Sequence, residues 1–259
     1  MKTRNLILTL VFAAIVIVEL LGRLIDNINL EYIAKPLIMI WIAVFFLLNA
    51  QKKSFKVPVL LAFFFSWVGD MFLMFSGGYD NEMFFFAGVG GFFFAQCMYV
   101  YLFLKFTEEN NRGRAELMTN RGRAELMTKG SKGSKGSKKG FLIRSPFMFI
   151  PLVGFLVGFY LLLLPGLEGL MKTIILVYAI SLIGMSLAAL NRKGRVGKAE
   201  FRWVFLGSLF FVISDSMIAL NKFYFEDGFP LSGFWIMLTY IAAQYLIMRG
   251  LILEKQSNP

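Results

Sequence analysis

Long apolar runs recur along the whole chain, and they leave few folds open to it. A helix needs about 20 predominantly apolar residues to cross a bilayer, and runs of about that length follow one another with short polar breaks. We therefore predict an all-α integral membrane protein, built as a bundle of eight transmembrane helices. The predicted spans cover residues 6–25, 33–48, 57–75, 83–106, 146–164, 170–190, 201–220 and 231–253.

The composition agrees with a membrane protein and excludes several kinds of chemistry. The chain is 58% hydrophobic and 17% aromatic, which is too apolar for a soluble protein of this length. It has no histidine, the commonest metal ligand and neutral-pH base, and its one cysteine, Cys97, rules out a disulfide framework. No phosphate-binding glycine loop, dinucleotide fingerprint or nucleophilic-serine elbow is present. We expect no metal and no cofactor.

The net charge of +11 lies in the loops, and it indicates how the chain is oriented. Lysine and arginine are in excess at the N-terminus and in residues 51–56, 107–140, 191–202 and 249–255, whereas the alternate loops are acidic or nearly neutral. The positive-inside rule then predicts that both termini are cytoplasmic. Membrane topology explains the basic charge, so we expect contact with the lipid bilayer and no nucleic-acid partner. The expected location is a bacterial inner membrane.

A basic, low-complexity segment divides the chain into two sets of four helices. Residues 111–119 read NRGRAELMT and residues 120–128 repeat them letter for letter, followed by Lys-Gly-Ser triplets. Segments rich in glycine, serine and lysine bury too little surface to order themselves. We predict helices one to four in residues 1–106, a disordered cytoplasmic loop in 107–140, and helices five to eight in 141–259.

Two aspartates stand inside predicted spans, Asp70 in the third and Asp215 in the seventh. A carboxylate in a bilayer is costly, so such a residue is a functional-site hypothesis by default. Each lies about 13 residues into its span, or roughly 20 Å at 1.5 Å per residue. Because both spans run in the same direction, the two aspartates should lie at matching depth.

A short internal sequence repeat suggests that the two sets of helices are related halves. In each set an aspartate follows a small residue, and an alanine-glutamine pair comes on the next span. Two four-helix halves with the same orientation are one known repeat arrangement. The four dipeptides are Gly69-Asp70, Ala95-Gln96, Ser214-Asp215 and Ala243-Gln244.

Lys35 stands near the outer end of the second span. Its ammonium group either reaches the lipid headgroups or has a functional role, in which it holds one aspartate ionised or receives a lipid phosphate. Glu19, in the first span, is most simply a partner of Lys35 or Arg23.

Uncharged polar residues complete the candidate substrate-binding set. Gln96 and Gln244 can each donate and accept hydrogen bonds, which suits either substrate orientation or helix packing. Tyr99 lies about one helical turn from Gln96, and Ser214 directly precedes Asp215. With Lys35, these four residues form the predicted binding site around the aspartates.

Taken in order, the motifs in these spans resemble the YhhN-like membrane proteins, a family that includes the animal lysoplasmalogenases. The resemblance implies hydrolysis of the vinyl-ether bond of lysoplasmalogen, which yields a fatty aldehyde and a glycerophospho-headgroup. One departure is Gln96, which stands where many relatives have histidine. The motifs are Ala34-Lys35-Pro36-Leu37, Gly69-Asp70-x-x-Leu73, Phe94-Ala95-Gln96-x-x-Tyr99, Gly207-x-x-x-Phe211-x-x-Ser214-Asp215 and Tyr240-x-Ala242-x-Gln244-x-x-Ile247.

The predicted function is therefore a membrane hydrolase in which Asp70 and Asp215 act as an acid/base pair. Paired carboxylates perform comparable chemistry in glycosidases, through an oxocarbenium-like intermediate. A transporter or lipid-binding protein, with the aspartates relaying protons or holding a headgroup, is the main alternative. In a third interpretation the aspartates only join helices.

Overall fold

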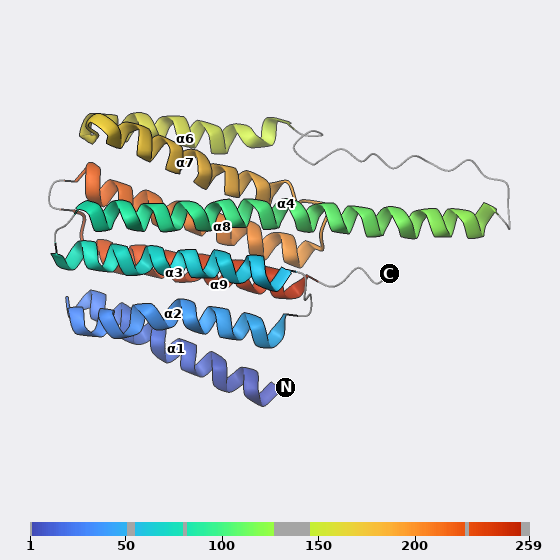
Figure 1. The fold of residues 1–259 in the computed structure, drawn as a ribbon, viewed down its shortest axis with the longest axis horizontal. Helices are drawn as coiled ribbons and strands as arrows, with labels where there is room; N and C mark the ends of the chain where they lie inside the picture. The colour runs from blue at the N-terminus through green and yellow to red at the C-terminus, as the bar shows by residue number, and fades with distance from the viewer. Residues whose placement is uncertain (1, 51–54, 80–81, 127–145, 226–227, 255–259) are drawn as a thin grey trace.

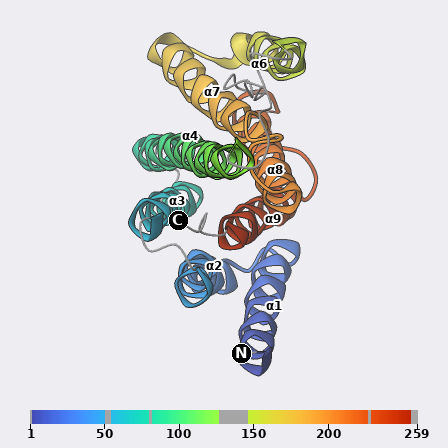
Figure 2. The same ribbon diagram turned by 90° about the vertical axis from the view of Figure 1, so that its right-hand side faces the viewer.

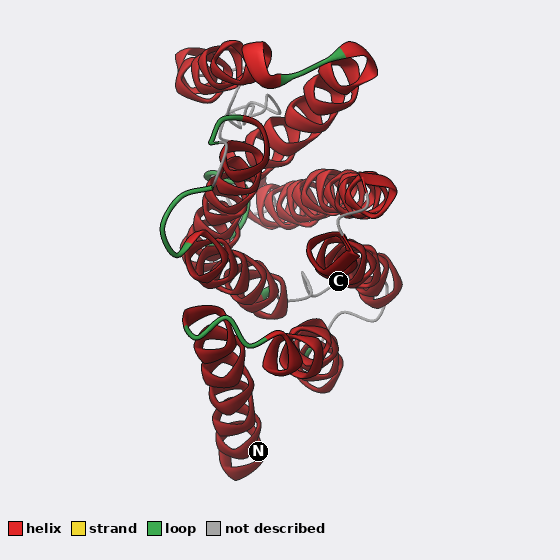
Figure 3. Cartoon of the chain, turned by 90° about the vertical axis from the view of Figure 1, so that its left-hand side faces the viewer, coloured by secondary structure: helices red, strands yellow, loops and turns green. Residues whose placement is uncertain are grey.

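The computed structural model describes residues 2–50, 55–79, 82–126, 146–225 and 228–254. Throughout these ranges the chain consists of helices and loops without a strand (Figure 3). The long helices are α1 (Lys2–Leu24), α2 (Ile28–Asn49), α3 (Lys56–Tyr79), α4 (Glu82–Leu126), α6 (Ile150–Leu163), α7 (Gly169–Leu190), α8 (Lys198–Phe223) and α9 (Ser232–Leu253). Two short 3-10 turns, η2 (Pro146–Phe149) and η3 (Leu164–Gly166), extend α6 at its two ends.

In the described ranges, eight helical segments are long and apolar enough to cross a membrane, which confirms the predicted number of spans. The fifth of them, Phe147–Gly166, combines η2, α6 and η3. The helices run side by side along one axis, and α1 begins and α9 ends at the same end of the bundle (Figure 1). At the opposite end, α1, α3 and α8 end and α2, α4 and α9 begin, and this end is called the turn end below.

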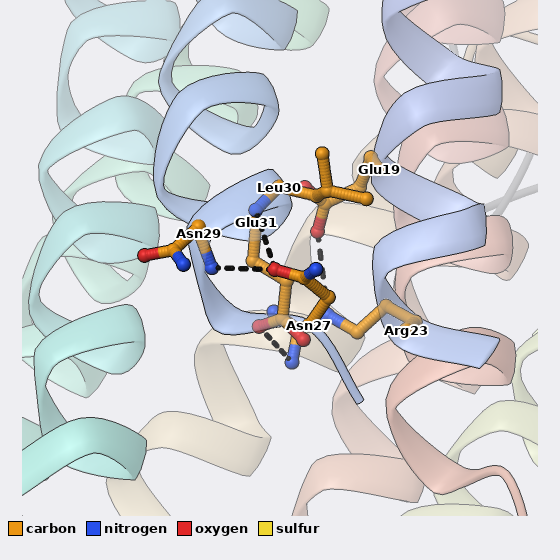
Figure 4. Close-up of polar contacts among 6 residues, drawn as sticks. All are labelled: Glu19, Arg23, Asn27, Asn29, Leu30 and Glu31. Atoms are coloured by element: carbon orange, nitrogen blue, oxygen red, sulfur yellow. Dashed lines mark hydrogen bonds and ion pairs between the residues drawn. The ribbon is translucent and has the colours of Figure 1, made fainter. Parts of the chain in front are cut away.

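Helix α2 begins at Ile28, five residues before the predicted start of its span. The Asn27 side chain accepts hydrogen bonds from the backbone nitrogens of Asn29 and Leu30 and so caps the helix (Figure 4). Pro36 would stand in the first turn of a helix that began at residue 33, and the earlier start places it inside the helix. Transmembrane helices tolerate interior proline because neighbouring groups satisfy the freed backbone carbonyl.

Helix α4 continues to Leu126, well beyond the end of the bundle (Figure 1). Residues 107–126 are thus helical, which differs from the flexible loop expected from residue 107. The repeated unit contains Arg, Ala, Glu, Leu and Met, which are strong helix formers, and it follows a helix that is already nucleated. The lysine-rich triplets lie outside the described residues.

Glycines bring two pairs of helices into backbone contact. A methyl group at Gly91 of α4 would lie 2.7 Å from the backbone nitrogen of Gly69 on α3. On the other side of the bundle, a methyl group at Gly207 of α8 would lie 2.8 Å from the Ala243 carbonyl oxygen of α9. Close approach through small residues is a common way for helices to associate in membranes.

Two further contacts between helices correspond when the first set of four helices is compared with the second. Helix α4 also packs against α7, and α9, its counterpart in the second set, packs against α2. Seen along the bundle, α3, α4, α8 and α9 form its centre, while α1 and α6 lie at opposite edges (Figure 2). These contacts are the ones that two related four-helix halves would repeat, whereas α1 packs against α9 without an equally extensive contact between α6 and α4.

At the end that carries the termini, Arg192 ties three elements together. It follows α7, is fully buried and forms an ion pair with Glu254, the residue after α9. Its guanidinium also lies over two rings of α4, 5.4 Å from the centre of Phe103 and 5.8 Å from that of Phe106. Cation–π contacts of this kind are strongest where water is excluded.

Candidate functional site

Asp70 of α3 and Asp215 of α8 are both buried inside the bundle, with 2% and 6% of their surfaces exposed. The helices that carry them run parallel, as the common depth expected from the sequence requires. Each carboxylate has its own set of hydrogen-bond partners.

The Asp70 carboxylate is held by α9. Tyr240 donates a 2.7 Å hydrogen bond to its Oδ2. Gln244, one turn further along α9, donates to the hydroxyl oxygens of Tyr240 and Ser66 over 3.3 and 3.0 Å. Tyr99 of α4 in turn donates to Gln244 Oε1 over 2.6 Å. All these groups are buried, and the network fixes α3, α4 and α9 around one carboxylate.

The Asp215 carboxylate is held by α7 and α4. Tyr178 of α7 donates to its Oδ2 over 2.5 Å, and Gln96 Nε2 of α4 donates to the same oxygen over 3.2 Å. Ser181 of α7 donates to the Gln96 carbonyl oxygen, which fixes the orientation of the amide. Gln96 therefore presents its nitrogen to the carboxylate.

A polar cavity of about 450 Å³ opens at the turn end, and Asp70 lies in its wall. Ligand pockets commonly measure about 300–1,000 Å³, so this cavity can hold a small polar molecule. Its other acidic and basic lining residues, apart from the phenol of Tyr240, are Arg23, Asp26, Glu31, Lys35 and Lys222.

A second, apolar cavity lies between α4, α6, α7 and α8, and it is lined by Asp215 and Tyr178 among many hydrophobic side chains. Its volume is about 50 Å³, so it is narrow in the structure as it stands. The two cavities share one wall, so Asp70 and Asp215 face spaces that adjoin. The shared residues are Leu73, Phe85, Phe92 and Ile218.

Lys35 lies in the wall of the polar cavity, which Asp70 also lines, and is 6% exposed. Glu19 itself pairs with Arg23 over 3.3 Å, as the sequence suggested, and Arg23 also pairs with Glu31 over 2.7 Å (Figure 4). These ion pairs join α1 to the start of α2 at the cavity mouth.

Ser214 and several residues that the sequence analysis did not select complete the site. Ser214 lines the polar cavity and donates a 3.1 Å hydrogen bond to the Ile236 carbonyl oxygen of α9. Helical spacing could have found two of the missed residues, because Ser66 and Tyr240 precede Asp70 and Gln244 by four positions and share their faces. Tyr178 and Ser181 are three apart on α7 and gave no comparable signal.

The charged groups of the site do not resemble a metal centre. Among the described residues, no group of three or more acidic or cysteine side chains is placed to hold an ion. What the arrangement offers is two carboxylates, each with a hydroxyl donor, at the border between a polar and an apolar space.

Comparison with known proteins agrees with the sequence motifs. The YhhN family model matches residues 30–251. Human lysoplasmalogenase TMEM86A is 43% identical over 92 residues, which is 34% of this chain and 37% of that protein. Bovine lysoplasmalogenase TMEM86A is 42% identical over 93 residues, with the same coverage. Each alignment thus spans little more than a third of the relative's length. No solved structure matches the chain significantly.

Proposed function

The chain belongs to the YhhN family, and from that premise we propose that it hydrolyses the vinyl-ether bond of lysoplasmalogen. The products are a fatty aldehyde and a glycerophospho-headgroup. One observation carries the proposal: Asp70 lines a polar cavity and Asp215 an adjoining apolar one. A lysophospholipid has a polar headgroup and one apolar chain, and its vinyl-ether bond lies where they meet. The lysoplasmalogenase relatives support the same substrate class.

Hydrolysis of a vinyl ether begins with a proton added to carbon. The proton goes to the vinyl carbon further from oxygen, which belongs to the apolar chain, and it leaves an oxocarbenium-like cation. Asp215 is the carboxyl that borders the apolar cavity, so we assign the acid role to Asp215. Proton transfer by a positioned acid or base contributes roughly 10²–10⁴-fold to a rate.

Water then adds to the cation, and Asp70 takes the water proton. Asp70 borders the polar cavity, where water has access, and Lys35 lines the same cavity, which suits a carboxylate that acts as the base. The hemiacetal formed in this way collapses when its hydroxyl proton passes to Asp215 and the ether oxygen takes the proton held by Asp70. Both aspartates return to their starting states, and one water is consumed for each bond broken.

The hydrogen-bond partners of the aspartates have positioning roles in this scheme. Tyr178 and Tyr240 each donate to one carboxylate oxygen and leave the other oxygen of that carboxylate for proton transfer. Gln96 stands where many relatives have histidine, and its amide does not titrate. Because it donates to Asp215, it can orient this carboxyl group without itself transferring a proton.

The proposal is tested with purified protein in detergent. Lysoplasmalogen and the corresponding saturated ether lipid are incubated with wild-type protein, and aldehyde release is measured over time. We expect aldehyde only from lysoplasmalogen, at a rate proportional to protein. A chain that releases none but carries protons or lipid across proteoliposome membranes would instead be a transporter.

A further inference from the structure

We propose that α6 is a gate, hinged at the turn end, through which the hydrocarbon chain of the substrate enters the apolar cavity from the bilayer, between α6 and α8. The inference rests on the proposed function, which requires a lysolipid chain beside Asp215 but does not say how the chain reaches it. Its evidence is the size of the apolar cavity and the way in which α6 is attached to its neighbours.

The apolar cavity is too small for a hydrocarbon chain while α6 is in its present position. Its volume is about 50 Å³, whereas pockets that enclose a ligand commonly measure about 300–1,000 Å³. Because protein interiors are close-packed, rotation of side chains alone opens little space. At least one of the helices around the cavity must therefore move when a chain binds.

Helix α6 is the least buried of the four helices around this cavity, and it lies at the edge of the bundle (Figure 2). In the most apolar stretch of its span 6% of the residues are buried, compared with 39–44% in the spans of α4, α7 and α8. It packs mainly against α7, and its contact with α8 is small. Displacing α6 would thus enlarge the cavity with the smallest loss of buried apolar surface. The α6 residues that line the cavity are Phe155, Leu156, Phe159, Tyr160 and Leu163.

The attachment of α6 is concentrated at the turn end. Among the residues of α6, all of which the structure describes, Leu163 at the end of the helix is the buried one. It packs in a small apolar cluster with Leu167 and Ile175. In η3, Gly166 lies directly against the carbonyl oxygen of Phe223 on α8, which leaves no room for a methyl group. These contacts hold one end of α6 and can serve as its hinge.

The opposite end of α6 is open to its surroundings. Phe147 of η2 is 79% exposed and Ile150, the first residue of α6, is 53% exposed. Gly154 and Gly158 follow, and nothing lies within 4 Å of a methyl group added to either of them. Close packing therefore does not require these two glycines, although glycine makes a helix less stable than alanine does. Glycine at both positions lets this part of α6 bend outward.

The gate leads to the carboxyl group that we assign as the acid. Asp215 and Tyr178 line the same cavity as the inner face of α6. A chain that enters beside α6 passes from lipid into an apolar space, so its apolar surface is not exposed to water on the way.

The test measures the motion of α6 by spin-label distances in lipid nanodiscs, in a Cys97→Ala background. Two label pairs join α6 to α8 at positions that are all exposed. Ile150→Cys with Lys198→Cys reports on the open end, and Leu162→Cys with Tyr224→Cys reports on the turn end. The probe is a saturated 1-alkyl lysophosphocholine, which has no vinyl-ether bond. We expect it to lengthen the first distance by about 4 Å, the van der Waals thickness of one inserted chain, and to leave the second unchanged.

Two results of this measurement would overturn the proposal. Distances that stay the same at both ends would show that the chain binds without moving α6. An equal increase at both ends would show that α6 moves as a whole and has no hinge at the turn end.

Alanine at the two glycines of α6 tests the same motion through activity. The double variant Gly154→Ala/Gly158→Ala should lower kcat/KM for lysoplasmalogen about tenfold, because alanine favours the straight helix, while the unfolding midpoint stays level or rises. Gly90→Ala on α4 and Gly184→Ala on α7 are matched controls, since nothing lies within 4 Å of an added methyl group at either position. A double variant with the kcat/KM of the wild type would contradict the proposal.

The spin-label measurement needs no hydrolysis, so the gate and the proposed function can fail separately. A wild type in which the open end of α6 moves, but which releases no aldehyde from lysoplasmalogen, overturns the proposed hydrolysis and supports the gate. A wild type that releases aldehyde while α6 stays in place does the reverse.

Discussion

Tyr240 of α9 donates a 2.7 Å hydrogen bond to Asp70 of α3, across 170 residues of sequence. Asp215 has a similar relationship with Tyr178, which donates to it over 2.5 Å. Each candidate catalytic carboxylate thus accepts a hydrogen bond from a tyrosine on another helix. Hydrogen bonds between transmembrane helices contribute about 0.6–2 kcal/mol, so these contacts serve position more than stability.

Removing either tyrosine hydroxyl should therefore affect turnover more than folding. We expect Tyr240→Phe and Tyr178→Phe each to lose about 1 kcal/mol of unfolding free energy. Aldehyde release should fall about tenfold or more, because the carboxylate loses its fixed orientation. Tyr245→Phe is the control, since its ring packs against Phe12 at 5.7 Å on another part of α9. Equal rates in all three variants would assign the tyrosines a packing role.

Neutralising the aspartates tests the acid/base assignment directly. Asp70→Asn and Asp215→Asn should each lower turnover at least about 10²-fold, while binding of a saturated lysolipid survives. Since residues that act as a unit are not additive, the double variant should be scarcely slower than either single one. Thermal stability should stay level or rise, because Asp70→Asn removes a buried charge and Asp215→Asn keeps the shape of a carboxyl group that is already neutral. A large loss of stability with unchanged turnover would instead identify the aspartates as helix contacts.

Much of the fold was predictable because transmembrane spans depend on local composition. The eight runs and the two aspartates could be read from the sequence, since apolar length and an isolated charge are visible without tertiary structure. The start of α2 was missed because a cap at Asn27 extends the helix beyond its apolar run. Tyr178 could not be selected, because tyrosine is common in membrane helices and its importance depends on α7 packing beside Asp215. The set of charged residues around the polar cavity could not be predicted either, since Arg23 and Lys222 line the same cavity only in the folded chain.

Adjacent glycines on α4 offer a test of the helix packing. Alanine at Gly91 would place a methyl group 2.7 Å from the Gly69 backbone, which cannot move without separating α3 from α4. We expect Gly91→Ala to destabilise the protein by about 1–3 kcal/mol, the usual cost of overpacking. Gly90→Ala is the control, because nothing lies within 4 Å of its added methyl group and alanine favours the helix. Thermal unfolding in detergent should show a lower midpoint for the first variant alone.

The buried pair of Arg192 and Glu254 predicts a different stability pattern. Arg192→Met would leave the Glu254 carboxylate buried without its cation, at a cost of roughly 3–5 kcal/mol. Adding Glu254→Leu should restore most of that loss, because an apolar pair needs no charge compensation. Unfolding free energies of the wild type, both single variants and the double variant give the coupling between the two residues. Strictly additive losses would show that the two side chains stabilise the fold independently.

The location of the turn end relative to the cell is the remaining prediction. Lysine and arginine are concentrated at the end of the bundle that carries both termini, so the positive-inside rule places that end in the cytoplasm and the polar cavity on the outer side. In a Cys97→Ala background, which removes the one native cysteine, single cysteines are introduced by Lys172→Cys and Lys198→Cys. Both positions are exposed, the first at the turn end and the second at the opposite end. A membrane-impermeant maleimide should label Lys172→Cys in intact bacterial cells and Lys198→Cys only after permeabilisation. The reverse pattern would invert the topology, and the polar cavity would then open to the cytoplasmic leaflet.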